Sequence, residues 1–229
     1  MTPMTRFAVY VAPRPGAFAT RAAAWLGWDA ARGQTVSQPD LPGLPRPPAA
    51  LTTDPRRYGF HGTVRAPFRP AEGLGEAEVG AQVEAIAAGL APVACDGLAL
   101  RNLAGFLALT PTGGEAALAA LAATVVEATN DLRAPLTDVE IARRRPEFLS
   151  SRQRILLARW GYPFVMEEFR FHLTLTEALT DDEAAQVAPV LERYFAPVLP
   201  RPFVIEDLCL FGEDVTGRFH LLHRYALTG

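Results

Sequence analysis

The chain of 229 residues has only two cysteines, no long apolar run and no excess of basic residues. Cys95 and Cys209 are far apart and fit no C-x-x-C spacing, so a thiolate metal site or a redox motif is not indicated. The start, MTPMTRFAVYVAPRPG, lacks a basic segment followed by an apolar core, and no window approaches about 18 uninterrupted apolar residues. We therefore expect a cytoplasmic enzyme or binding protein with no membrane partner.

The charge balance also limits the partner. With 22 Lys and Arg against 25 Asp and Glu, the net charge is -3 at pH 7. Such a chain has no overall positive field that would gather long nucleic acids by counterion release. A small-molecule substrate is therefore favoured, whereas an RNA end would have to be held locally. No obligate protein partner is indicated.

Strand-like and helix-like segments alternate along the chain, which predicts an α+β fold. The segments typical of strands are 6–13, 57–68, 93–103, 105–111, 168–179, 202–214 and 217–227, and those typical of helices are 17–28, 75–90, 114–131, 137 onward, 150–162 and 182–195. The Thr-x-x-Glu spacing at 137–140 and at 180–183 is that of a capping box, which predicts that a helix begins at each of these sites. Residues 33–55 are rich in proline and glycine and are expected to form a long loop, which could close over a substrate. Each half of the chain contains a strand with the pattern His-x-Thr, followed by a helix and a hairpin.

The two His-x-Thr patterns carry the functional argument. They are GFHGTVRAPF at 59–68 and FRFHLTLTEA at 169–178. Residues i and i+2 of a strand point to the same face, so His61 shares a face with Thr63, and His172 shares one with Thr174. The residues between and around them form an opposite, apolar face suited to a core: Phe60, Gly62 and Val64 on one strand, and Phe171, Leu173 and Leu175 on the other.

These side chains suit in-line displacement at phosphorus. An imidazole with a pKa near ~6.5 can accept or donate a proton at neutral pH, and two imidazoles in different environments can do both at once. His61 and His172 are therefore the predicted acid/base pair, with the two roles unassigned, and Thr63 and Thr174 are predicted to hold the nonbridging oxygens.

Further phosphate-binding candidates lie beside the motifs. Arg65 and Arg170 continue the two polar faces, and an arginine supplies several donors to anionic oxygens. Tyr58 precedes the first motif and either reaches the substrate or belongs to a solvated loop. Three arginines at 143–145 are interpreted as the end of a helix, where cations complement the helix dipole, and not as a nucleic-acid patch.

Metal chemistry is not indicated by any motif. The chain has no H-E-x-x-H, no H-x-H and no cluster of carboxylates beside either motif histidine. His220 and His223 are three residues apart, so in a strand they face opposite sides. We expect no metal and no cofactor.

Together, FHGTV and FHLTL, roughly 110 residues apart in the printed sequence, resemble the 2H phosphoesterase superfamily, which is named after two such motifs. The segments RFAVYVAP, GFLALTP and RAPLTDVEIARRRPEFLSSRQRILLARWGYPFVMEEFRFHLTLTEAL extend the resemblance, in particular to the branch found with bacterial phosphonate-utilisation genes. It implies that residues 1–229 are one domain of two lobes, with pseudo-twofold symmetry, two mainly antiparallel sheets flanked by helices, and a central cleft. It also implies hydrolysis of a cyclic phosphodiester or a related transfer, carried by the residues of the two motifs, and it favours a place for Tyr10 in the cleft. With no metal motif in the sequence, we expect this reaction to be metal-independent. Gly62 departs from the alanine expected at that position.

Several functions remain open at this point. The cyclic phosphate could belong to a ribose, to a nucleotide such as ADP-ribose, or to an RNA end with a 2',3'-cyclic phosphate and ligase-like activity. A non-catalytic module that binds a nucleotide or phosphate is the alternative from another class. The presence of both histidines favours the enzyme.

Overall fold

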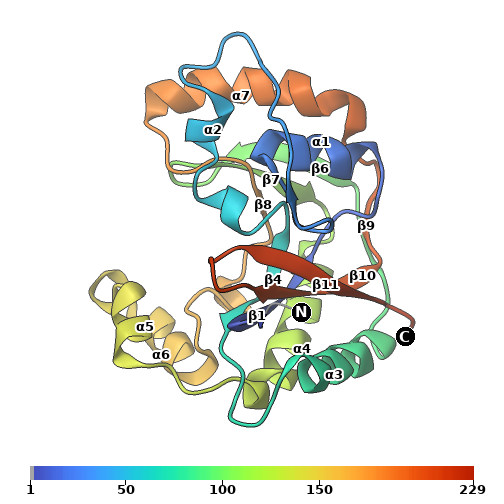
Figure 1. Cartoon of the computed structure of the whole chain (residues 1–229), viewed down its shortest axis with the longest axis vertical. Coiled ribbons are helices and arrows are strands. Elements are labelled where there is room, and N and C mark those ends of the chain that lie inside the picture. The colour runs from blue at the N-terminus through green and yellow to red at the C-terminus, as the bar shows by residue number, and fades with distance from the viewer. Residues whose placement is uncertain (1–2) are drawn as a thin grey trace.

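The computed structural model describes residues 3–229, which form helices and antiparallel strands (Figure 1). The strands are β1 (Arg6–Val11), β2 (Trp28–Asp29), β3 (Gln34–Thr35), β4 (Gly62–Phe68), β5 (Val93–Cys95), β6 (Gly97–Asn102), β7 (Leu107–Thr112), β8 (Leu173–Thr174), β9 (Phe203–Ile205), β10 (Asp207–Glu213) and β11 (Phe219–Ala226). The α-helices are α1 (Ala17–Leu26), α2 (Pro48–Leu51), α3 (Glu76–Ala88), α4 (Glu115–Ala128), α5 (Asp138–Arg143), α6 (Ser151–Trp160) and α7 (Asp181–Phe195). The predicted α+β class is confirmed.

The main sheet has seven strands in the order β11-β10-β1-β4-β8-β7-β6, and all neighbours are antiparallel. Its weakest join lies between β4 and β8, which are paired at one position, Gly62 opposite Leu173. The sheet therefore consists of a four-stranded part and a three-stranded part that meet at the two His-x-Thr motifs. Short pairs β2-β3 and β5-β9 complete the strand pairing.

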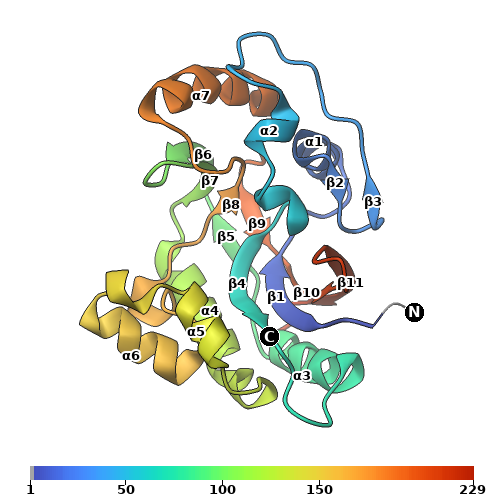
Figure 2. The same ribbon diagram turned by 60° about the vertical axis from the view of Figure 1, so that its left-hand side comes forward.

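Each part of the sheet combines strands from both halves of the chain. The hairpin β6-β7 follows the first motif in sequence but pairs with β8 of the second motif, and β10 pairs with β1. Figure 2 shows β6, β7 and β8 together at one end and β1, β4, β10 and β11 at the other. The halves therefore exchange their hairpins: β6-β7 lies beside the second motif strand, and β10-β11 joins the part of the sheet that contains the first.

The helices cover the two ends of the sheet. Figure 1 shows α1, α2 and α7 gathered at the end that contains β6 and β7, and α3 and α4 at the end that contains β10 and β11. Helices α5 and α6 stand beside α4 in both views. Capping boxes at Thr137 and Thr180, in which each threonine side chain accepts a hydrogen bond from the backbone N–H three residues on, begin α5 and α7 as the sequence predicts. No helix within residues 3–229 has the length and apolar character needed to cross a membrane.

The motif strands are shorter than the sequence suggests. β4 begins at Gly62 and β8 contains only Leu173 and Thr174, so each catalytic candidate histidine lies immediately before its strand. The expected apolar face is found, since Phe60, Val64, Phe171, Leu173 and Leu175 all belong to the main core. Within the expected loop at 33–55, β3 pairs with β2, and α2 forms near its end.

Gly62 is held at close range by the second motif. A Cβ atom at this position would lie 2.3 Å from Cζ and 2.5 Å from Cε2 of the Phe171 ring. Since Phe171 is itself buried, the ring has no free space into which to move. Glycine therefore stands where alanine was expected because the Phe171 ring occupies the space that a Cβ atom would need. Gly62 and Phe171 pack against each other where β4 meets β8.

We predict that Gly62→Ala lowers the free energy of unfolding by about 1–3 kcal/mol, because the added methyl group overpacks the join. Phe171→Leu in the same chain should recover part of that loss. Urea unfolding measures both changes. Gly89→Ala is the matched control, since an added Cβ there has its nearest neighbour at 3.7 Å, and a change within about 0.5 kcal/mol is expected. Equal losses at Gly62 and Gly89 would contradict this account of the join.

Candidate active site

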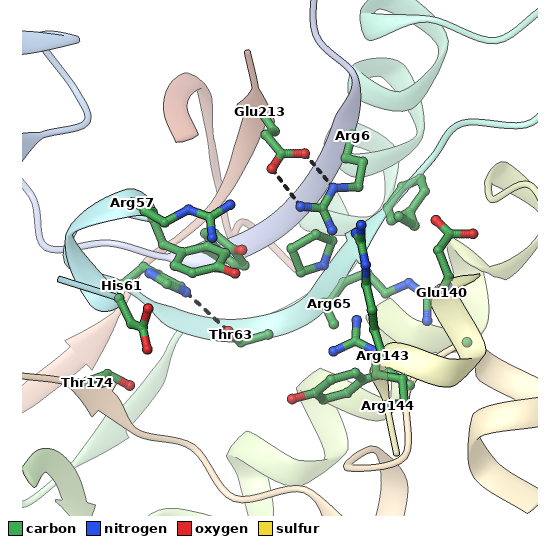
Figure 3. A pocket seen from close by; sticks show the side chains of 18 of the residues that line it. Arg6, Arg57, His61, Thr63, Arg65, Glu140, Arg143, Arg144, Thr174 and Glu213 are labelled. Atoms are coloured by element: carbon green, nitrogen blue, oxygen red, sulfur yellow. Dashed lines mark hydrogen bonds and ion pairs between the residues drawn. The ribbon is translucent and has the colours of Figure 1, made fainter. Parts of the chain in front are cut away.

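A cavity of about 1010 Å³ lies beside the join between the two motif strands (Figure 3). His61 and Thr63 of the first motif line it, together with Thr174 of the second. The aromatic residues of its wall are Tyr10, Tyr58, Phe68, Phe106, Trp160 and Tyr162. Seven arginines and four carboxylates also line it, so the wall is strongly charged.

In the first motif, both ring nitrogens of the histidine are held by hydrogen bonds. Nδ1 of His61 lies 2.9 Å from the backbone oxygen of Gly59, and Nε2 lies 3.2 Å from Oγ1 of Thr63. A carbonyl oxygen only accepts, so Nδ1 carries the proton in neutral His61 and donates it to Gly59. Nε2 is then unprotonated and accepts from the Thr63 hydroxyl. The basic nitrogen therefore faces the threonine that the motif provides.

The second motif repeats the backbone contact of the first. Nδ1 of His172 lies 2.8 Å from the backbone oxygen of Arg170, which is again the residue two positions before the histidine. His172 does not line the cavity itself and is partly exposed at its edge, where its ring centroid lies 5.6 Å from that of Phe106. In both motifs the backbone therefore fixes Nδ1 and leaves Nε2 for other partners.

His61 has an unusual environment for an imidazole. The ring of Tyr10 stacks on it, with centroids 3.8 Å apart and planes inclined by 24°. The Tyr10 side chain is only 1% exposed, so this face of His61 is shielded from water. Burial, with a smaller contribution from repulsion by His172, lowers the pKa of His61 to about 4, although the hydrogen bond to Gly59 acts in the opposite direction. His61 is neutral at pH 7 as a result.

The carboxylates of the wall are largely occupied by arginines. Glu213 pairs with Arg6, Glu140 pairs with Arg69 at 3.0 Å, and Glu177 pairs with Arg46 at 2.7 Å. These pairings leave a set of arginines on the cavity wall with no carboxylate partner among the described residues: Arg57, Arg65, Arg133, Arg143 and Arg144. The cavity therefore has an excess of positive charge although the chain as a whole is acidic.

The phosphate-binding candidates are not all brought together. Tyr10, Tyr58 and Arg65 line the same cavity as His61. Arg170 does not: it is exposed, and its guanidinium donates to the backbone oxygens of Glu167 and Phe169 at 2.9 and 2.6 Å. The reason is that residue 170 precedes the short strand β8, so the strand alternation used to place it does not apply there.

Four further residues of the wall were not predicted from the sequence. Arg143 ends α5 and Arg144 caps it, so the interpretation of 143–145 as a helix end is confirmed, yet both arginines also line the cavity. Arg133 and Tyr162 join them from neighbouring loops. The run of three arginines was the available signal, but no sequence pattern shows which face of a short helix will border a distant strand.

Metal ligands are not gathered at this site. Within residues 3–229, no group of three or more His, Cys, Asp or Glu side chains is arranged to hold a metal ion. His220 pairs with Asp214 at 2.8 Å and His223 with Glu76 at 3.1 Å, so each of these histidines has its own carboxylate partner.

Comparison with known proteins assigns a family. Residues 63–220 match a family described as a protein of unknown function, DUF1045, and the chain belongs to that family. It is also similar to two bacterial proteins named ribose 1,5-bisphosphate phosphokinase PhnN. The protein of Janthinobacterium sp. (strain Marseille) is 39% identical over 220 residues, and that of Laribacter hongkongensis (strain HLHK9) is 38% identical over 213. Each alignment covers 93% of this chain and 49% of the relative, so the chain spans about half the length of the curated relatives it matches.

Three solved structures match the chain over nearly its whole length at low sequence identity. TT0787 of Thermus thermophilus covers 98% of both chains at 14% identity, with a TM-score of 0.47. LigT of E. coli, solved with NADP+, covers 99% of both chains at 15% identity, with a TM-score of 0.44. A structure described as that of a phosphoesterase covers 99% of both chains at 17% identity, with a TM-score of 0.43.

Proposed function

We propose that the chain is a phosphodiesterase of the 2H type, which opens a small cyclic phosphate with two histidines and no metal. The observation that carries the proposal is the repeated geometry of the motifs. In each, a backbone oxygen two residues before the histidine binds Nδ1 and leaves Nε2 for proton transfer. The threonines Thr63 and Thr174 lie on adjacent strands and both border the cavity, where their hydroxyls can donate to phosphate oxygens.

The environment of His61 supports an assignment of the two roles. A general base must be unprotonated in the free enzyme, and the lowered pKa of about 4 keeps Nε2 of His61 in that state at neutral pH. Nε2 takes a proton from water while the water oxygen forms a bond to phosphorus. The opposite P–O bond breaks, and His172 gives its Nε2 proton to the departing alkoxide. The product is an open phosphate monoester beside a free hydroxyl group, and solvent restores both histidines.

A ribose-derived cyclic phosphate is the substrate that we favour. The two curated relatives are named for a kinase of ribose 1,5-bisphosphate, and this chain matches about half of each. The resemblance to a branch found with phosphonate-utilisation genes points to the same class of sugar phosphate. The acidic net charge favours a small molecule over a long RNA.

Phosphorus NMR of a panel of cyclic phosphates tests the proposal. The purified chain is incubated in EDTA with ribose 1,2-cyclic phosphate, an ADP-ribose cyclic phosphate and an RNA oligonucleotide that ends in a 2',3'-cyclic phosphate. Conversion of a small cyclic phosphate to its monoester is the expected result. Turnover of the RNA end alone would overturn the substrate class, and tight calorimetric binding without any product would favour the non-catalytic module.

The lowered pKa of His61 leads to a prediction about pH. Protonation of the base abolishes catalysis, so kcat/KM should fall as the pH drops through about 4, and not near the ordinary value of ~6.5. Tyr10→Ala would admit water to the imidazole and should move this acid limb upward, whereas Tyr10→Phe keeps the stacked ring and should leave it low. Initial rates from roughly pH 3.5 to roughly pH 9 measure the limb. A limb near ~6.5 in the unmodified protein would argue against His61 as the base.

A further inference from the structure

One arginine of the cavity wall, Arg65, is buried with hydrogen-bond donors that have no acceptor among residues 3–229. Arg65 is 1% exposed, and only Nη1 is bonded, to the backbone oxygen of Trp160 at 2.8 Å. Nε and Nη2 are buried and have no hydrogen-bond partner among residues 3–229. Buried donors of a charged group are costly when they are left unpaired. Because Arg65 also lines the cavity, a small movement of its guanidinium would present these donors to an anion there.

Other cationic and polar groups gather around the same turn. Arg133 packs against Gly161, where an added Cβ would lie 3.3 Å from its side chain. The guanidinium of Arg144 lies 4.9 Å from the ring centre of Tyr162, which belongs to the same turn. Burial lowers the pKa of Arg65 to about 10, with a further contribution from Arg133, so Arg65 remains charged at pH 7. The turn 160–162 thus brings several positive charges to one part of the cavity wall.

The arginines near the turn 160–162 line the same cavity as the histidine motifs, at a different part of its wall. In Figure 3, Arg65 is drawn between His61 on one side and Arg143 and Arg144 on the other. Thr63 and Arg65 are two residues apart on β4, which corresponds to at most ~7 Å of strand. That separation is about the width of one sugar ring, so a single small substrate can reach both places.

We infer that Arg65, Arg143 and Arg144 form a second anion subsite, which binds a terminal phosphate monoester of the same substrate whose cyclic phosphate lies at the histidine motifs. A monoester carries up to two negative charges and three acceptor oxygens, which matches several guanidinium groups better than the single charge of a diester does. The substrate is therefore a doubly phosphorylated small molecule and not the end of a nucleic-acid chain. The inference rests on the proposed function, which supplies the reacting end of this substrate, and Arg65 with its neighbours supplies the recognition of the other end.

Calorimetric titration with ribose 5-phosphate tests the subsite without requiring turnover. The full chain should bind ribose 5-phosphate and not ribose. Arg143→Gln and Arg144→Gln should each weaken binding tenfold or more, since a charged hydrogen bond is lost. Arg145→Gln is the matched control and should bind as the unmodified protein does, because Arg145 stacks on Phe148 and does not line the cavity. Binding that survives Arg144→Gln but is lost in Thr63→Val would locate the phosphate at the histidine motifs and overturn the inference.

A kinetic comparison completes the test and separates it from the proposed function. Ribose 1,2-cyclic phosphate with a 5-phosphate should have a kcat/KM at least tenfold above that of the compound without it, and Arg144→Gln should bring that ratio close to one. A dinucleotide with a 2',3'-cyclic end that outcompetes the doubly phosphorylated sugar would overturn the preference for a monoester. If ribose 5-phosphate binds as expected but no cyclic phosphate is hydrolysed, the subsite stands and the proposed chemistry fails. If hydrolysis occurs with no effect of the 5-phosphate, the chemistry stands and the subsite fails.

Discussion

His61→Ala and His172→Ala are each expected to reduce kcat by ~10²- to 10⁴-fold, because each removes one proton transfer from the same step. Nδ1 of each ring binds a backbone oxygen, so only the Nε2 function is expected to matter for the reaction. The double variant should lose little more than the worse single variant, since residues that act as a unit are strongly non-additive. Single-turnover assays in EDTA with the best substrate of the panel measure all three rates.

The control for these variants is another histidine of the same sheet. His223 lies on β11 with half of its side chain exposed, outside the cavity wall, and its partner is Glu76. His223→Ala should therefore retain the kcat of the unmodified protein. Far-UV circular dichroism checks that each variant is folded. Wild-type rates in both His61→Ala and His172→Ala would refute the two-histidine mechanism, whatever the substrate.

Arg65→Met is expected to stabilise the free protein while it removes phosphate binding. The arginine buries a charge and two unpaired donors, and replacement of buried ionic groups by apolar ones of similar size stabilises proteins by about 1–4 kcal/mol in favourable cases. Loss of the bond to the Trp160 oxygen works against this gain, so we expect a rise of about 1–2 kcal/mol in the free energy of unfolding. A binding site that destabilises its own fold is a common trade-off between function and stability.

Urea unfolding with and without ribose 5-phosphate measures both parts of this prediction. The unmodified protein should be stabilised by the ligand according to its affinity, whereas Arg65→Met should unfold at the same urea concentration in both conditions. Arg65→Lys is the comparison, since it keeps the buried charge but loses the planar set of donors, and it should be less stable than Arg65→Met. A strong destabilisation by methionine would mean that Arg65 serves the fold and not a ligand.

Local signals in the sequence predicted local structure well. The Thr-x-x-Glu spacing placed the starts of α5 and α7, because a capping box involves only four consecutive residues. Such local signals did not predict the pairing between strands that are far apart in the sequence. The repeated order of strand, helix and hairpin does not reveal that β6-β7 joins β8 and that β10 joins β1, since those pairings depend on contacts between residues far apart in the chain.

The site was partly predictable for the same reason. Strand alternation correctly separates the cavity-facing His61 and Thr63 from the core residues Phe60 and Val64. Alternation is less informative near Arg65, because β4 has one extra residue relative to β1 on each side of it. Tyr10 pairs with Thr63, Val9 pairs with Arg65, and Phe7 pairs with Phe68. Such bulges re-aim side chains, so the final direction of Arg65 depends on the partner strand.

The sequence alone singled out the residues to which we assign the chemistry: two histidines, each with a threonine two positions on and an apolar face behind it. Only the tertiary structure decided which charges surround them. It placed Arg143 and Arg144, at the end of α5, beside the cavity that β4 lines. It also turned Arg170 toward nearby backbone oxygens and covered His61 with Tyr10. The difference is physical, since a periodic pattern fixes the direction of neighbouring side chains, whereas the charge and burial of a site are summed over elements that meet only on folding.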